Sequence, residues 1–176
     1  MKKILAAIFI FAVFCFSRCK KDPVVDSNGL PAATQTGANT LGFMLNGQPW
    51  TPQGPTLPPT LSIDFDQSYK NGIFSIVAYQ TINNVRTQFI IGVRDSLNFM
   101  QIPTTLNLNQ SSLYSISIDK PCDYFNQLTD VQSSGSLTIS KLDKTNHIIS
   151  GTFNATLSKI NCGNIQITDG RFDMKY

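Results

Sequence analysis

Every side-chain carboxylate in this sequence belongs to an aspartate, because its eleven acidic residues include no glutamate. Any catalysis or metal binding by carboxylates would therefore use aspartate. Asp64 and Asp66, in the stretch IDFD, alternate with apolar residues and would share one side of a strand. Two carboxylates there could bind a divalent cation, but calcium takes about six to eight oxygens, usually from a loop that this stretch lacks. We therefore expect a solvated strand face at Asp64 and Asp66, and no metal site.

Two further groups could take part in catalysis. Asp169 and Asp173 flank Arg171 in TDGRFD, where a turn aspartate and a surface ion pair are expected. His147, the single histidine, is expected in a turn, and no G-x-S-x-G motif prepares a serine for it. Glycoside hydrolysis needs two carboxylates across a cleft, and nothing marks such a pair. The sequence thus predicts no catalytic residue, no cofactor and no enzymatic activity.

Trp50, in NGQPWTPQGP, is the single tryptophan and a possible ligand contact. Exposed aromatic side chains of exported domains can stack on sugar rings. A lone tryptophan at a strand end more often fills a core, so we expect a core position for Trp50.

Cys122 and Cys162 are the two cysteines beyond the first 20 residues. In an exported chain this even number predicts a disulfide. The bond would close a loop of about 40 residues and stabilise the fold by about 3–4 kcal/mol in the chain-entropy model. A catalytic thiol or a metal ligand would need a nearby histidine, and the position of His147 does not suggest one.

The first residues are typical of a secretory signal. Lys2 and Lys3 precede an uncharged apolar run at 4–17, whose 14 residues are too few for a membrane-spanning helix of roughly 20. The stretch FSRCKKDP around Cys19 resembles bacterial lipoprotein signals, in which the cysteine after the cut is acylated. Phe16 and Arg18 depart from that pattern, and Cys15 is a second candidate with a poorer fit. We expect residues 1–18 to be the signal and Cys19 to be lipidated, with simple cleavage to a secreted domain as the alternative.

Removal of the signal changes the charge. Three of the 14 basic residues lie before Cys19, so the mature chain would carry 11 basic and 11 acidic residues. Nucleic-acid binding needs a concentrated positive surface, and no basic run exists, so no nucleic-acid partner is expected. The expected partners are a membrane, reached through the anchor, and an unknown protein, glycan or small apolar ligand.

Alternating apolar and polar residues predict strands throughout residues 41–176. The stretches 61–65, 85–93, 113–119 and 135–140 each alternate, and 72–80 is apolar on both faces, as in a central strand. The last third predicts a meander over 136–142, 148–158 and 165–176, with a glycine bulge at Asp169-Gly170. We expect one all-β domain at 41–176, an antiparallel sandwich or flattened barrel of about eight or nine strands. Residues 19–40 are polar and rich in Pro, Gly and Thr, which predicts a flexible tether.

The start ATQTGANTLGFMLNGQPW and the end SGTFNATL and NIQITDGRFDMKY resemble a family of small uncharacterised lipoproteins from Gram-negative bacteria. This resemblance implies an exported β domain of unknown function and carries over no site residue. We therefore expect an envelope protein, anchored by lipid to the outer membrane, that is a non-enzymatic binding or structural module. The alternatives are a lipocalin-like carrier of a small apolar ligand and, less favoured, a carbohydrate-active hydrolase.

Overall fold

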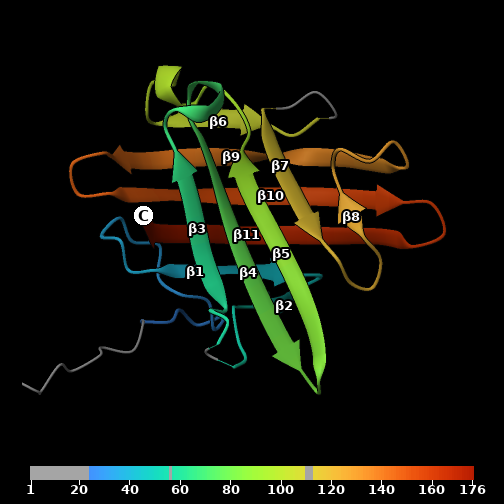
Figure 1. The fold of residues 1–176 in the computed structure, drawn as a ribbon. Coiled ribbons are helices and arrows are strands. Elements are labelled where there is room, and N and C mark those ends of the chain that lie inside the picture. The colour runs from blue at the N-terminus through green and yellow to red at the C-terminus, as the bar shows by residue number, and fades with distance from the viewer. Residues whose placement is uncertain (1–23, 56, 110–112) are drawn as a thin grey trace, which may run out of the picture.

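The computed structural model describes residues 24–55, 57–109 and 113–176, and the signal and Cys19 lie outside these residues. The described chain forms two antiparallel sheets that pack face to face as a sandwich (Figure 1). The all-β prediction is confirmed, and the sandwich, not the barrel, is the arrangement observed. Eleven strands are present in the described ranges, more than the eight or nine expected, because β2 and β8 are very short.

The six-stranded sheet has the order β2-β1-β11-β10-β9-β6, and the five-stranded sheet has the order β3-β4-β5-β7-β8. The bounds are β1 (Thr40–Leu45), β2 (Gln48–Trp50), β3 (Leu61–Asp66), β4 (Ile73–Ile82), β5 (Val85–Val93), β6 (Thr104–Asn107), β7 (Tyr114–Ile118), β8 (Tyr124–Phe125), β9 (Val131–Asp143), β10 (Ile148–Lys159) and β11 (Gly163–Lys175). Two 3₁₀ turns, η1 (Tyr69–Asn71) and η2 (Leu97–Phe99), lie together at one end. The predicted C-terminal meander is therefore β9, β10 and β11.

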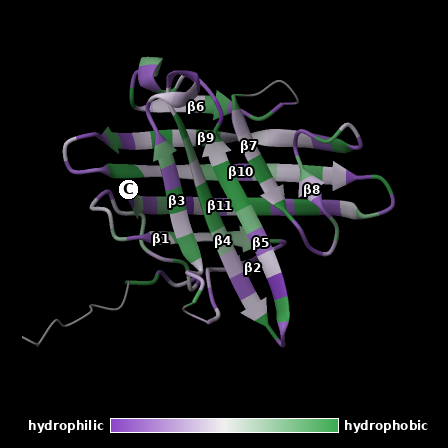
Figure 2. Cartoon of the chain, viewed as in Figure 1, coloured by the Kyte–Doolittle hydropathy of each residue, from purple (hydrophilic) through white to green (hydrophobic). Residues whose placement is uncertain are grey.

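The core lies between the sheets, and Figure 2 shows the alternation of apolar and polar residues along β3. Phe43 of β1, Phe89 of β5 and Phe153 of β10 meet at its centre. The ring centroids of Phe43 and Phe89 lie 4.5 Å apart, and those of Phe89 and Phe153 lie 5.5 Å apart. Buried residues of both sheets form a single cluster, so the interior of the sandwich is filled by side chains.

The predicted bulge in β11 is confirmed. Phe153 pairs with Gly170 and Ala155 with Ile167, so Thr168 and Asp169 together face one residue of β10. Asp169 has a φ of 53°, and a Cβ on Gly170 would lie 2.5 Å from the Phe153 ring. The extra residue reverses the alternation, so Ile167 points inward before the bulge and Phe172 points inward after it.

The prediction of a flexible tether is wrong for its described part, because residues 24–39 are packed on the domain. Leu30 is fully buried, and Pro31 lies over β1 so closely that a Cβ on Gly42 would come within 2.6 Å of the proline ring. The segment continues across the outer face of the six-stranded sheet, where Lys141 Nζ of β9 donates to the Gln35 carbonyl at 3.0 Å. Hydrogen bonds, more than apolar area, hold it there, and that is why its composition indicated a flexible chain.

The predicted disulfide is present and joins the two sheets. Cys122 lies between β7 and β8, and Cys162 lies in the turn between β10 and β11, at a sequence separation of 40. Beside it, the Tyr124 hydroxyl donates to the Cys162 carbonyl at 2.7 Å. The bond therefore ties the β7–β8 connection, at the edge of the five-stranded sheet, to the β10–β11 turn of the other sheet.

We predict that Cys122→Ser lowers the free energy of unfolding by about 3–4 kcal/mol, because the unfolded chain regains the entropy of a 40-residue loop. Thermal melts with and without reductant measure the effect. The unmodified chain should lose stability in reductant, whereas Cys122→Ser should melt at one temperature in both. Equal melting of the unmodified chain in both conditions would contradict a stabilising bridge.

Candidate functional site

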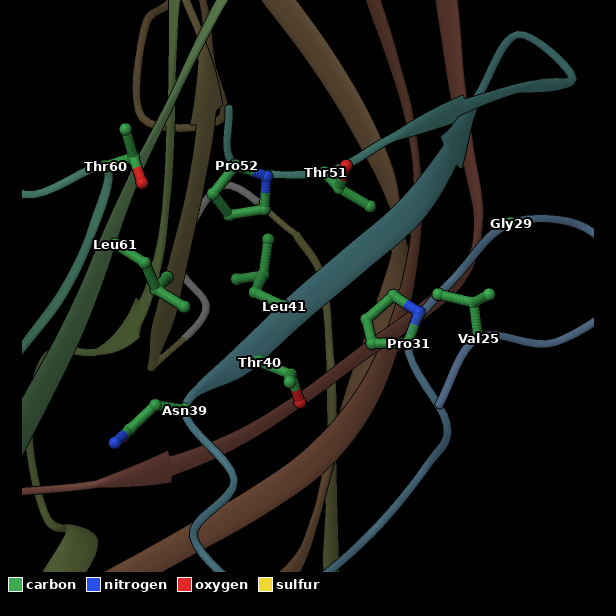
Figure 3. A pocket seen from close by; sticks show the side chains of 10 residues that line it. All are labelled: Val25, Gly29, Pro31, Asn39, Thr40, Leu41, Thr51, Pro52, Thr60 and Leu61. Carbon is green, nitrogen blue, oxygen red and sulfur yellow. The ribbon is translucent and has the colours of Figure 1, made fainter. Parts of the chain in front are cut away.

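A groove beside the N-terminal segment is the candidate binding site (Figure 3). It has a volume of about 290 Å³ and opens between residues 24–31, β1 and the chain around β3. The lining residues are Val25, Gly29, Pro31, Asn39, Thr40, Leu41, Thr51, Pro52, Thr60 and Leu61. In Figure 3 the side chains of Leu41, Leu61 and Pro52 gather on one side of the groove, and those of Val25 and Pro31 gather on the other.

The groove is lined by apolar residues together with threonine, asparagine and glycine. None of its ten lining residues is titratable, so the lining itself offers no general acid, general base or activated nucleophile. Threonine hydroxyls and apolar side chains can supply hydrogen bonds and contact area. Asn39 is already engaged, because its Oδ1 accepts a hydrogen bond from the Lys175 backbone N–H at 2.9 Å.

The wall formed by residues 24–31 is set by local turn chemistry. The Asp26 carboxylate accepts hydrogen bonds from the backbone N–H groups of Asn28 at 2.8 Å and Leu30 at 3.1 Å. Its other oxygen pairs with the Arg171 guanidinium at 2.9 Å. The Leu30 hydrogen bond is the largest influence, and it lowers the pKa of Asp26. These contacts hold Val25 and Pro31 at the groove.

The second anchor of the segment is Asp173, which the sequence analysis placed in a surface ion pair. This prediction is wrong, because Asp173 is 1% exposed under residues 34–38. Its carboxylate accepts hydrogen bonds from the Thr34 hydroxyl at 2.6 Å, from the backbone N–H groups of Thr36, Gly37 and Ala38 at 2.9, 2.8 and 3.1 Å, and from the Ser150 hydroxyl at 2.8 Å. Arg171 pairs with Asp26, not with Asp173.

The protonation of Asp173 reflects this environment. Burial raises the pKa of a carboxyl group, but the hydrogen bonds from Thr34, Thr36 and Ser150 outweigh burial and bring the pKa of Asp173 down to about 2. The group is therefore an ionised acceptor in the native protein. A residue held in this way stabilises structure and cannot donate a proton near neutral pH.

The other candidate carboxylates have structural partners or none. Asp64 is exposed on β3, as expected for a solvated face. Asp66 accepts hydrogen bonds from the N–H and hydroxyl of Ser68, both at 2.7 Å, and the Ser68 hydroxyl is the main cause of its lowered pKa. Asp169 is exposed at the bulge. In the described ranges no three His, Cys, Asp or Glu side chains are grouped so that they could hold a metal ion.

The two remaining candidates take the places expected of them. His147 is exposed in the turn between β9 and β10, with a φ of 57° and its ring edge-on to Tyr176 at 5.5 Å. Trp50 is 3% exposed, and its ring stacks on Phe43 at 4.8 Å between centroids. The core position of Trp50 is confirmed, so its ring does not provide a surface platform for a ligand.

Sequence reasoning missed the groove and the role of Asp173. Their signals were present in the stretches DSNGLP and TQTG, which combine a turn-forming aspartate with small hydroxyl and glycine residues. Such residues expose backbone N–H groups that can donate hydrogen bonds to a carboxylate. The sequence does not indicate which carboxylate accepts them. No family model, curated protein or solved structure matches the chain. Within the described residues, no helix is long and apolar enough to cross a membrane.

We predict that Asp173→Asn destabilises the protein by about 2–4 kcal/mol, because the amide nitrogen replaces an acceptor with a donor facing other donors. Asp169→Asn is the matched control in the same strand, and its exposed side chain should leave the melting temperature nearly unchanged. Equal melting of both variants would show that the Asp173 network contributes no stability. Urea unfolding monitored by circular dichroism gives the comparison.

The same network predicts an acid transition. The pKa of Asp173 is lowered from 3.8 to about 2 on folding, so its stabilisation is complete above pH 4 and is lost as the pH falls towards 2. Unfolding free energies measured across this range should fall more steeply in the unmodified chain than in Asp173→Asn. Parallel pH profiles for the two proteins would contradict the assignment.

Proposed function

We propose that this chain is an envelope protein, anchored by acyl chains on Cys19, whose β domain is a non-enzymatic binding or structural module. The lipid anchor follows from the signal pattern and from Cys19 at its end. The observation that carries the binding role is the groove, whose lining offers hydroxyl groups and apolar contact without a titratable side chain. An unknown protein, a glycan or a small apolar molecule is the proposed ligand class.

The alternatives have less support. A lipocalin-like carrier needs a closed barrel around an apolar cavity of roughly 300 Å³ or more. This fold is a sandwich, and the side chains between its sheets form one buried cluster. A hydrolase needs a carboxyl group with a raised pKa as its acid. Hydrogen bonds lower the pKa of Asp26, Asp66, Asp143 and Asp173, which suits structural roles.

The anchor is tested by metabolic labelling in a Gram-negative host with an alkyne-tagged fatty acid. The unmodified chain should take up the label and partition into the detergent phase of an extraction, because the acyl chains of the anchor contribute about 0.8 kcal/mol per buried CH₂. Cys19→Ala should lose both properties, and Cys15→Ala is the matched control that should keep them. An unlabelled chain that stays in the aqueous phase would overturn the proposal.

A further inference from the structure

One end of the sandwich exposes apolar side chains from three segments that are distant in sequence. We call it the apolar end and define it by Val24, Val25, Leu57, Ile82 and Val85, each at least half exposed. They are five of the nine large apolar side chains exposed in the described part of the chain. In Figure 1 the blue segment that begins at Val24, the β2–β3 connection and the β4–β5 turn all lie at the lower end of the view.

Backbone hydrogen bonds join the β2–β3 connection to β4, and the N-terminal segment meets this connection at the groove. Gln53, in the β2–β3 connection, accepts a hydrogen bond from the Thr81 N–H at 2.8 Å and donates to the Tyr79 carbonyl at 3.0 Å. Val25 lines the same groove as Pro52 and Leu61. The apolar end is therefore one surface built on the sheets, and its side chains keep their relative positions.

The charge of this end suits contact with a lipid surface. Residues 24–31, 51–61 and 79–88 contain two charged side chains, Asp26 and Arg86. Asp26 is neutralised by its pair with Arg171 at 2.9 Å. The Arg86 guanidinium lies 3.7 Å above the centre of the Tyr79 ring. The segments thus present apolar groups and one cation, and the neighbouring Asp119 carboxylate accepts a hydrogen bond from the Gln88 N–H at 2.8 Å. Apolar groups beside a cation bind to the headgroup region of anionic bilayers.

The length of chain between Cys19 and Val24 limits how far Val24 can lie from the membrane. Five peptide units separate Cys19 from Val24, so their Cα atoms lie within about 18 Å of each other in any conformation. Because residues 24–39 are packed on the sheet through Leu30 and Asp173, the segment after Val24 adds no free length. β4 runs between the two ends, and its ten residues separate the η1–η2 end from the β4–β5 turn by roughly 30 Å.

We propose that the apolar end lies against the bilayer in which the acyl chains of Cys19 are inserted, and that the η1–η2 end points away from it. This inference rests on the acylation of Cys19 in the proposed function. Contact is shallow and interfacial, because the polar turn residues Asn83 and Asn84 lie between Ile82 and Val85. The sandwich is therefore held at the membrane in one orientation.

The test uses the full-length chain, made in a Gram-negative host with the alkyne-tagged fatty acid and placed in vesicles of phosphatidylethanolamine and phosphatidylglycerol. Part of the lipid carries bromine on its acyl chains, which quenches tryptophan fluorescence at short range. Leu57→Trp reports on the apolar end, and Phe99→Trp, in η2 and three-quarters exposed, is the matched control. The buried Trp50 gives a background that the unmodified chain measures separately.

We expect the protein to carry the fatty-acid label. Brominated lipid should quench the tryptophan fluorescence of Leu57→Trp, and the quenching of Phe99→Trp should not exceed that of Trp50 in the unmodified chain. Val85→Trp and Tyr69→Trp repeat the comparison at second positions of the two ends, so that one misfolded variant does not decide the result. Labelled protein with equal quenching at both ends, or stronger quenching of Phe99→Trp, would overturn the orientation alone. Unlabelled protein that stays off the vesicles would overturn both the anchor and the orientation.

Discussion

The arrangement of the N-terminal segment depends on one buried carboxylate. Asp173 projects from the outer face of β11, where a strand residue would ordinarily meet solvent, and it is covered because Thr34, Thr36, Gly37 and Ala38 supply the donors that replace water. Among the described residues no ion pair balances it, and backbone N–H groups and hydroxyls compensate for burial of its charge. With this contact the segment becomes part of the domain and forms one wall of the groove.

The composition of the groove lining and the hydrogen bonding of the aspartates support the same proposed function. Titratable groups do not line the groove, and the described aspartates with shifted pKa values are engaged in turns or in the Asp173 network. Asp143, for example, accepts hydrogen bonds from the N–H groups of Thr145 and Asn146 and so shapes the β9–β10 turn. Asp26, Asp66 and Asp143 therefore organise turns, and Asp173 holds the N-terminal segment.

The strands, the β11 bulge and the disulfide could be predicted from the sequence because each leaves a local or countable pattern. Alternation identified the inward side chains of β3 and β5, and the change of parity between Ile167 and Phe172 located the bulge. The choice of sandwich over barrel depends on which distant strands pair, and alternation is the same in both folds. The docking of residues 24–39 left no periodic signal, because Leu30 is its one fully buried large apolar side chain and most of its contacts are polar.

The pairing of β1 with β11 has a consequence for biogenesis. Thr36 and Asp173, which meet in the native fold, are 137 residues apart, and β1 itself pairs only with the short β2 and with β11. A chain that emerges from a ribosome or a translocation pore N-terminus first must keep β1 without its main neighbour until β11 has followed it. Completion of the six-stranded sheet is therefore late, because β1 pairs with β11 across most of the chain, whereas β9, β10 and β11 pair locally. The pairing of β1 with β11 therefore forms only after nearly the entire chain is present.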